Sequence, residues 1–276
     1  MTDTDESLPH PEPVAYRSMM PPAVIELTDL HKTLGDRPVL DGVSLQVFRG
    51  ETLCIIGGSG AGKSVTLKHI VGLLRPDRGR VRVDGVEVTT AGPTLLGTVR
   101  KKIGFLFQGA ALLNSLTVFE NVALPLREHE ELAEAEVRSR VMERLELVHL
   151  ADAAGKLPGD LSGGMKKRAG LARAIVRDPG IILYDEPTAG LDPVIASTIN
   201  DLILEMQRRL KVTSVLVTHD MSSCFRVSSR IAMLLRGRIH KVGRPDELKS
   251  SDDPAIRQFV HGESEGPLTR ESNRVE

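Results

Sequence analysis

The sequence feature that most constrains the fold of this chain is residues 57–64, Gly-Gly-Ser-Gly-Ala-Gly-Lys-Ser, which match the pattern G-x-x-x-x-G-K-[ST]. A short β-rich apolar run, residues 52–56, precedes this segment, and residues 65–74 carry apolar side chains at helical spacing. The segment therefore lies between a predicted strand and a predicted helix, the position that a phosphate-binding loop requires. A glycine-rich turn that binds nothing is the alternative, and the flanking elements argue against it.

The chemistry of this loop follows from its residue types. Glycines let the backbone curl until successive N–H groups point inward as an anion nest, and the following helix N-terminus adds partial positive charge. Lys63 can reach the β- and γ-phosphates of a nucleotide, and the hydroxyl of Ser64 suits a hard Mg²⁺ ion. The residues expected to bind the nucleotide here are Gly57, Gly58, Ser59, Gly60, Ala61, Gly62, Lys63, Ser64 and Val65.

The composition argues against a nucleic-acid partner, a disulfide framework and a zinc site. The formal net charge is -1, so the chain lacks the basic balance of nucleic-acid-binding domains, and aromatic residues make up only 3%, which leaves few platforms for stacking bases. We therefore expect no nucleic-acid partner. The two cysteines, Cys54 and Cys224, form no C-x-x-C pair, which argues against a disulfide framework or a zinc site and fits a reducing cytosol.

Length and hydropathy predict one large domain without a membrane-spanning helix. Its 276 residues suffice for one large α/β domain with an inserted subdomain. No apolar run reaches the roughly 18 residues that a membrane-spanning helix needs, and the acidic N-terminus lacks the pattern of a secretory signal. Any membrane work would therefore need partner subunits.

The first part of the chain predicts a tail followed by an antiparallel β layer. Residues 1–22 are polar and proline-rich, which favours a disordered tail, and the folded domain is expected to span residues 23–249. The β layer is predicted from residues 24–27, 40–48 and 80–88, with turns at residues 36–37 and 49–51 and a type I′ turn at Asp84-Gly85.

The middle of the chain predicts a helical subdomain, residues 109–178, set into the α/β core. It contains a helix from Glu120 to about Leu126, which Pro125 ends or kinks, and an amphipathic helix over residues 130–150. The other predicted elements are strands at residues 103–108, 181–184, 212–218, 231–235 and 239–242, and helices at 195–210 and from Pro245.

The C-terminal residues, 250–276, are polar apart from one apolar island at 257–262. A disordered end is the first interpretation of this tail, and a docking arm is the alternative. No internal repeat and no second phosphate loop occurs in the sequence.

Acidic residues follow the apolar strand at 181–184. In an open parallel sheet, ligands bind at the carboxyl ends of the strands. Asp185 is then expected to face the Mg²⁺ ion held by Ser64, and Glu186 to orient or deprotonate an attacking water. The alternative is a pair of exposed acids at a strand end.

Two further polar residues, Gln108 and His219, end other predicted strands. Both are expected at the same edge, where either can contact a γ-phosphate or position water by hydrogen bonding. A single histidine at a strand end is more often structural. The expected metal ligands are Ser64, Gln108 and Asp185.

Residues 161–165, Leu-Ser-Gly-Gly-Met, predict the start of a helix that residues 178–180 end. Ser162 can cap this helix, whose N-terminus, with its hydroxyl and free N–H groups, also offers a second phosphate-binding site. A capped helix without a ligand is the alternative.

In this order, the phosphate loop, Gln108, residues 161–164, residues 184–192 and His219 resemble the ATPase subunit of ABC transporters, over about residues 24–248. The resemblance implies a P-loop NTPase fold of the ABC type, with a mixed β core, an antiparallel β layer and an inserted α-helical subdomain. It implies ATP and Mg²⁺ as cofactors, and Glu186, Gln108 and His219 as catalytic residues.

The same resemblance implies a head-to-tail homodimer with two ATP molecules at its interface. In that family the signature residues of one subunit close on the γ-phosphate bound by the other. The matching residues here are Ser162, Gly163 and Gly164, and Asp192 matches the aspartate that communicates between the two sites. Leu34 stands where many of these ATPases stack adenine on an aromatic side chain, so an apolar contact is expected instead.

A finer resemblance is to the ATPase of bacterial Mla/MCE-type phospholipid transporters. It covers residues 105–129, residues 161–169 with Met165 in place of the commoner Gln, and residues 257–268. It implies integral-membrane permease subunits, an MCE-type lipid-binding protein and a peripheral location at the cytoplasmic face of the bacterial inner membrane. The segment after Gln108 is the expected surface for transmission to the permease.

Three alternatives to this function stay open at this point. An ABC ATPase of another transport system, for lipoprotein release or small-solute import, shares every catalytic residue. A soluble ABC protein of DNA repair or translation tends to carry long coiled coils or two ATPase units in one chain, and this sequence has neither. A P-loop kinase of another family does not need residues 161–164.

Overall fold

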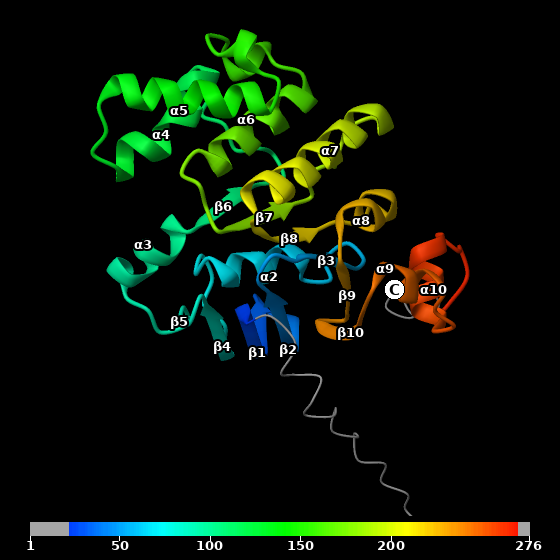
Figure 1. Ribbon diagram of the computed structural model, residues 1–276. Helices are drawn as coiled ribbons and strands as arrows, with labels where there is room; N and C mark the ends of the chain where they lie inside the picture. Colours follow the sequence, from blue (N-terminus) through cyan, green and yellow to red (C-terminus); the bar gives the residue numbers. More distant parts are fainter. Residues whose placement is uncertain (1–21, 270–276) are drawn as a thin grey trace, which may run out of the picture.

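The computed structural model describes residues 22–269, whose strands form two sheets with a helical lobe above them (Figure 1). A four-stranded sheet has the order β2-β1-β4-β5, and a six-stranded sheet has the order β10-β9-β3-β8-β7-β6. The expected α/β architecture, with an antiparallel β layer and a helical insertion, is therefore confirmed.

The four-stranded sheet is antiparallel throughout. Its strands are β1 (Ala23–Leu34), β2 (Arg37–Phe48), β4 (Arg78–Val83) and β5 (Val86–Glu87). Asp84 and Gly85 have φ values of 48° and 79°, as the predicted type I′ turn requires. The turn between β1 and β2 falls at residues 35–36, one residue before the predicted position, because Gly35 takes the positive φ there.

The six-stranded sheet carries the strands that lead into the predicted motifs. Its members are β3 (Thr52–Ile56), β6 (Ile103–Leu106), β7 (Ile181–Asp185), β8 (Thr213–Val217), β9 (Arg230–Leu235) and β10 (Arg238–Gly243). All neighbours are parallel except β10, which pairs antiparallel with β9, so the sheet is mixed. Because the carboxyl ends of parallel strands meet at one edge, the segments that follow β3, β6, β7 and β8 are brought together.

Residues of β3 alternate between two hydrophobic cores. Leu53 and Ile55 pack in the core shared with the antiparallel sheet and helix α2 (Lys63–Ile70), whereas Cys54 and Ile56 pack in the core shared with the helical lobe. Both faces of the strand are therefore buried, as its unbroken apolar run predicts. This double anchoring fixes the position of the phosphate loop that follows.

The helical lobe sits at the top of Figure 1. It consists of α4 (Val118–His129), α5 (Glu134–Leu147), α6 (Gly163–Ile175) and the 3-10 turns η1 (Ala151–Ala153) and η2 (Pro158–Asp160). Thr117 and Glu120 start α4 with a reciprocal capping box. The remaining helices are α3 (Pro93–Lys101), α7 (Pro193–Leu210), α8 (Met221–Val227), α9 (Pro245–Lys249) and α10 (Pro254–His261).

Two predictions for this lobe differ from the structure in detail. Of the two effects predicted for Pro125, ending α4 is wrong, because the helix continues to His129 and the buried Val122, Ala123 and Leu126 hold it in the core, whereas a kink at Pro125 stays a prediction. The amphipathic helix begins at Glu134 rather than at residue 130, since Ala133 has an extended backbone and starts it.

The C-terminal segment is also different from its first interpretation. Residues 254–261 form α10, which Asp253 caps and which buries Ala255, Ile256 and Gln258 against the rest of the protein. A disordered end is therefore wrong for these residues, because Ala255, Ile256, Phe259 and Val260 all pack against the hydrophobic core. The predicted tail over residues 1–22 lies outside the described residues except for Pro22, and residues 270–276 lie outside them too.

Among residues 22–269, no helix is both long enough and apolar enough to cross a bilayer.

Candidate functional site

The phosphate loop connects β3 to α2 through backbone conformations that need glycine. Gly57 has φ 155° and Gly62 has φ 104°. A Cβ atom at Gly57 would lie 2.3 Å from the carbonyl oxygen of Leu234, and one at Gly62 would lie 2.7 Å from Cδ2 of Leu40. The loop is thus packed closely between β9 and β2, so its amide groups are held at the N-terminus of α2, where an anion binds.

Lys63, the first residue of α2, is 8% exposed. Its Nζ donates to the carbonyl oxygens of Gly57 (2.8 Å) and Gly58 (3.1 Å), and lies 3.8 Å from Oε1 of Glu186. Burial lowers the pKa of Lys63, and the nearby carboxylates of Glu186 and Asp185 oppose that shift. The ammonium group therefore lies between the loop and the two acids.

Ser64 and Asp185 form the second contact at this edge. The Ser64 hydroxyl donates to Oδ1 of Asp185 at 2.7 Å. Burial raises the pKa of Asp185, while the hydrogen bond from Ser64 lowers it. A hydroxyl and a carboxylate are oxygen donors of the kind that Mg²⁺ prefers, and Mg²⁺ sites use few protein ligands. The pair therefore fits the predicted metal.

Glu186 follows β7 with an unusual backbone, φ 49°, and a buried side chain. A carboxylate oxygen of Glu186 lies 3.0 Å from Nδ1 of His219, and the main-chain N–H of His219 donates to Oε2 at 3.4 Å. The ring of His219 is 63% exposed, so it contacts Glu186 at one side and solvent at the other. This histidine is therefore not a buried structural residue.

Residues predicted for the site line one cavity of about 480 Å³, whereas Asp185, which is hydrogen-bonded to Ser64, is not among its lining residues. Gln108, Lys63, Ser64, Glu186 and His219 all line it, although they come from widely separated parts of the sequence. The full lining is Leu34, Arg37, Val39, Ser59, Gly60, Gly62, Lys63, Ser64, Val65, Gln108, Glu186 and His219. Leu34, expected near the base of a nucleotide, is 43% exposed at this cavity.

The predicted signature residues lie elsewhere. Ser162 caps α6, with its Oγ accepting from the N–H of Met165 at 3.3 Å. Asp192 caps α7 in the same way, accepting from Val194 and Ile195 at 3.0 Å. Neither they nor Gly163 and Gly164 line the phosphate-loop cavity of their own chain.

These two helix starts pack against each other. A Cβ atom on Gly164 would lie 2.5 Å from Cγ2 of Ile195, and one on Gly163 would lie 3.3 Å from Cδ2 of Leu191. Beside them, Val194 is 74% exposed and Ile195 is 38% exposed. The signature segment therefore forms one exposed surface with the start of α7, apart from the loop.

Three residues at the site were not predicted from the sequence. Arg37 and Val39, on β2, line the cavity. Lys167, on α6, is 5% exposed and donates to the carbonyl oxygens of Gln108 and Glu186. No local pattern marks Arg37 or Val39, whereas Lys167 stands on the helical face that otherwise carries glycine and apolar residues.

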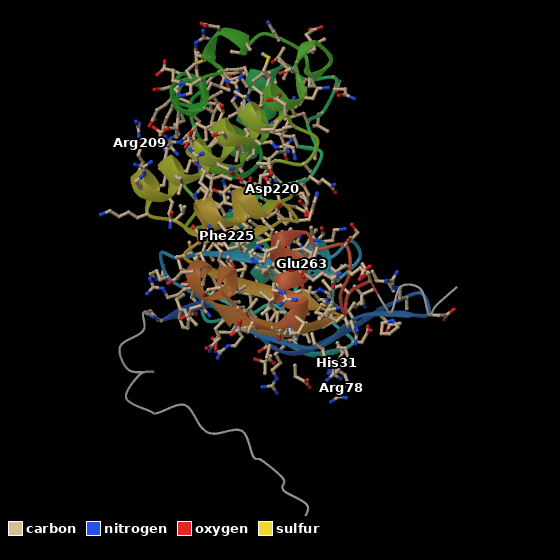
Figure 2. All side chains as sticks on the ribbon, turned by 90° about the vertical axis from the view of Figure 1, so that its right-hand side faces the viewer. His31, Arg78, Arg209, Asp220, Phe225 and Glu263 are labelled. Atoms are coloured by element: carbon tan, nitrogen blue, oxygen red, sulfur yellow. The ribbon has the colours of Figure 1, made fainter. Side chains whose placement is uncertain are left out.

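A second cavity, of about 560 Å³, adjoins the first and shares Glu186 and His219 with it. Asp220, which follows His219, caps α8 and accepts from the hydroxyls of Thr188 (3.2 Å) and Ser223. These bonds join the segment after Glu186 to the segment after His219, so the two expected catalytic residues share one polar support. Figure 2 shows Asp220 between the helical lobe and the sheets.

The fold, the phosphate loop, the serine–aspartate pair and the buried glutamate define a P-loop ATPase. Residues 40–189 match the ABC transporter family. The chain belongs to the ABC transporter family, as the subunit that binds and hydrolyses ATP.

Relatives with this architecture cover most of the chain. It is 42% identical over 244 residues to the Mycobacterium leprae "Probable ribonucleotide transport ATP-binding protein mkl". This match covers 88% of this chain and 70% of the relative. It is 40% identical over 245 residues to the Escherichia coli (strain K12) "Intermembrane phospholipid transport system ATP-binding protein MlaF", which covers 89% of this chain and 91% of the relative.

Solved structures agree with this assignment. The ATP-binding cassette MJ0796, in a dimeric post-hydrolysis structure with ADP and phosphate, has 33% sequence identity to this chain and a TM-score of 0.75. The match covers 80% of this chain and 98% of the MJ0796 chain. CbiO1 from Clostridium perfringens, part of an ABC transporter complex, is 29% identical with a TM-score of 0.76, and covers 91% of this chain and 98% of that chain. Cassettes of this family form dimers, as the first of these structures shows.

Proposed function

We propose that this chain, as a homodimer, hydrolyses ATP with Mg²⁺ to drive a bacterial membrane permease that moves phospholipid. The observation that carries the proposal is the convergence of Lys63, Ser64 and Glu186 on a cavity that residues 162–164 do not line, with Asp185 hydrogen-bonded to Ser64. A second copy of the chain then supplies residues 162–164, so hydrolysis depends on the closing of two subunits.

The loop side of the site holds the nucleotide and the metal. The loop amides and Lys63 bind the phosphates, and Lys63 exchanges its carbonyl partners for phosphate oxygens. Ser64, Asp185 and the side-chain oxygen of Gln108 supply oxygen donors for Mg²⁺. The metal, when bound, neutralises negative charge on the phosphates.

Glu186 orients the attacking water and accepts its proton. Its carboxylate lies in the cavity and is held by His219 on one side and near Lys63 on the other. The exposed ring of His219 and the side chain of Gln108 can each reach a γ-phosphate in this cavity, and both then report whether that phosphate is present.

The other half of the site comes from the partner subunit. Ser162 and the N–H groups of Gly163 and Gly164 begin α6, a helix of 13 residues, and its N-terminus attracts a phosphate. Asp192 lies on the adjoining helix start and links the two sites of the dimer. Because phosphoryl transfer depends mainly on positioning and charge, a site divided between subunits makes hydrolysis follow closure.

A groove beside Gln108 is the proposed docking site for the permease. It has a volume of about 390 Å³, and its apolar side chains include Phe105, Phe107 and Leu113. The rings of Phe105 and Phe107 stack with centroids 4.1 Å apart, and Leu113 is 47% exposed. Arg100, Lys101, Arg173 and Arg177 also line this groove, and a combination of exposed apolar and arginine side chains is typical of a protein interface. It lies between β6 and the helical lobe, so movement of the lobe changes its shape.

Phospholipid is the cargo that the sequence favours. The similarity to the MlaF protein, whose name states intermembrane phospholipid transport, and the matching residues at 105–129 and 161–169 support it. An MCE-type lipid-binding protein is then a further partner, and the complex lies at the cytoplasmic face of the inner membrane. A different cargo is the second candidate, because the mycobacterial relative is named for ribonucleotide transport.

One experiment separates the two cargoes. The chain is purified from detergent-solubilised membranes with its permease, reconstituted in vesicles, and assayed for phosphate release with added phospholipid or added ribonucleotide. At saturating ATP, we expect phospholipid composition to change the rate and an added pyrimidine ribonucleotide to leave it unchanged. Stimulation by ribonucleotide alone would contradict the phospholipid assignment and leave the ATPase assignment intact.

A further inference from the structure

Lys167 is a buried lysine whose ammonium group joins three parts of the protein. It lies on α6, which starts at Ser162, and its side chain is directed into the protein, where the residue is 5% exposed. Its Nζ donates to the carbonyl oxygen of Gln108 and to that of Glu186, the latter at 2.9 Å. One side chain of the helical lobe therefore bonds to the segments that follow β6 and β7.

Burying the ammonium group of Lys167 is energetically unfavourable, which indicates that this charge has a function. Removing an ammonium group from water is unfavourable unless polar partners replace its hydration. Burial lowers the pKa of Lys167, and the carboxylates of Asp185 and Glu186 oppose that shift. The other buried residues of α6 are glycine, alanine, leucine and isoleucine, so Lys167 is a charged residue on an otherwise apolar face.

The positive charges of Lys167 and Lys63 balance the negative charges of two nearby carboxylates. The two buried lysines face two buried carboxylates, Asp185 and Glu186. Under the proposed function, Lys63 serves the phosphates of the nucleotide and the carboxylate of Asp185 serves the metal. Lys167 is then the cation that stays with the main chain of Glu186, because its partners are carbonyl groups that take no part in binding ATP.

We infer that Lys167 is a positioning residue, which fixes the main chain of Gln108 and Glu186 relative to α6. The inference rests on the proposed function, in which the Ser162 end of α6 contacts the nucleotide of the partner subunit. The same helix then touches one ATP site through Ser162 and the other through Lys167. Docking of α6 on the partner's nucleotide is thereby linked to the placement of the chain's own Glu186.

Two substitutions at this position test the inference. Lys167→Met keeps a long side chain but removes the charge and the donors, and Lys167→Gln keeps an N–H donor without the charge. We expect Lys167→Met to lower kcat at least about tenfold, because small displacements of a catalytic group reduce rates strongly. Affinity for a fluorescent ATP analogue is expected to change less than twofold, and Lys167→Gln to lie between Lys167→Met and the unaltered protein.

Arg168→Met is the matched control. Arg168 is the next residue on α6 and donates to two carbonyl oxygens, those of Val148 and His149, which lie within the helical lobe. Its loss removes a comparable pair of bonds without touching Gln108 or Glu186. We expect it to lower the melting temperature while the kcat of the folded protein is kept. Equal losses of kcat in the two variants would overturn the positioning role.

A double-mutant comparison with Glu186→Gln decides how Lys167 acts. If Lys167 works by placing the carboxylate of Glu186, Lys167→Met has little further effect on the residual turnover of Glu186→Gln. The inference would be overturned if the kcat losses of the two substitutions multiply in the double variant. It would also be overturned if Lys167→Met keeps full turnover while Glu186→Gln is inactive. If Glu186→Gln itself keeps full turnover, the proposed function fails instead, so the two failures are distinguishable.

Discussion

Nζ of Lys63 lies 3.8 Å from Oε1 of Glu186, with 9% and 10% of the two side chains exposed. The side chain that we assign to the phosphates and the one that we assign to water are thus within reach of each other. Nucleotide phosphates compete with the Glu186 carboxylate for the same ammonium group. Binding and hydrolysis are therefore expected to respond differently to removal of that carboxylate charge.

Glu186→Gln is expected to lower kcat by about 10² to 10⁴, the usual contribution of a general base. ATP binding is expected to stay equal or become tighter, because a neutral amide no longer attracts Lys63. Phosphate release measures the first effect, and titration with a fluorescent ATP analogue measures the second. Glu205→Gln, at a partly exposed ion pair with Arg209 on α7, is the control. Turnover near that of the unaltered protein in Glu186→Gln would refute the role.

Lys63→Ala is expected to weaken nucleotide binding about 10- to 100-fold, because hydrogen bonds to charged groups contribute about 1.5–3 kcal/mol. The same fluorescent titration measures it. Lys68→Ala serves as control, since Lys68 is exposed on the same helix. Unchanged affinity in Lys63→Ala would count against the phosphate-loop assignment.

The parts of the site that the sequence predicts are those where a local motif and a strand end coincide. Lys63 and Ser64 follow β3, and Asp185 and Glu186 close β7, so the parallel sheet brings them together without further information. The place of His219 follows from β8 in the same way.

The parts that the sequence does not predict depend on tertiary packing. Lys167 shares a helical face with glycine and apolar residues, but a lysine inside a charged stretch usually indicates an exposed residue, so this spacing alone does not show that Lys167 is buried. Arg37 reaches the cavity because the β1–β2 hairpin lies beside the loop, which no spacing in the sequence shows. Helix α10 was not predicted, because a helix of eight residues is held mainly by the side chains that it buries, and these lie within an otherwise polar tail.

Leu113→Glu tests the proposed docking groove. A carboxylate among Phe105, Phe107 and Leu124 opposes burial of an apolar partner surface, whereas Leu113 lies outside the phosphate-loop cavity. We expect the amount of permease that co-purifies with the variant to fall at least about tenfold, while the free subunit still binds ATP. Leu95→Glu, at another exposed leucine, is the control. Undiminished recovery of the permease with Leu113→Glu would exclude the groove.

Asp84→Asn tests an electrostatic contribution to stability. The carboxylate of Asp84 accepts from Lys102 (2.6 Å) and Arg49 (3.0 Å), and the Lys102 hydrogen bond holds the pKa of Asp84 below its usual value. A lowered pKa stabilises the folded state above the unfolded value near 3.8, and this stabilisation is lost as pH falls through the folded pKa. Asparagine suits the positive φ of Asp84, so the turn is kept.

Urea unfolding across pH checks this prediction. At pH 7 we expect Asp84→Asn to be less stable by up to about 1 kcal/mol, the usual upper value for a partly exposed ion pair. The difference is expected to shrink below pH 4 and under high salt. A difference that is independent of pH and salt would assign the effect to the turn rather than to charge.

Division of the ATP site between two copies is the central claim, and a structure of Glu186→Gln bound to MgATP tests it most directly. The account predicts a head-to-tail dimer in which Oγ of Ser162 lies about 3 Å from a γ-phosphate oxygen held by the phosphate loop of the partner. Ser162→Asp, which keeps the helix cap but repels phosphate, is expected to abolish this dimer in sedimentation. An ATP-bound complex in which Ser162 contacts no γ-phosphate would contradict the account.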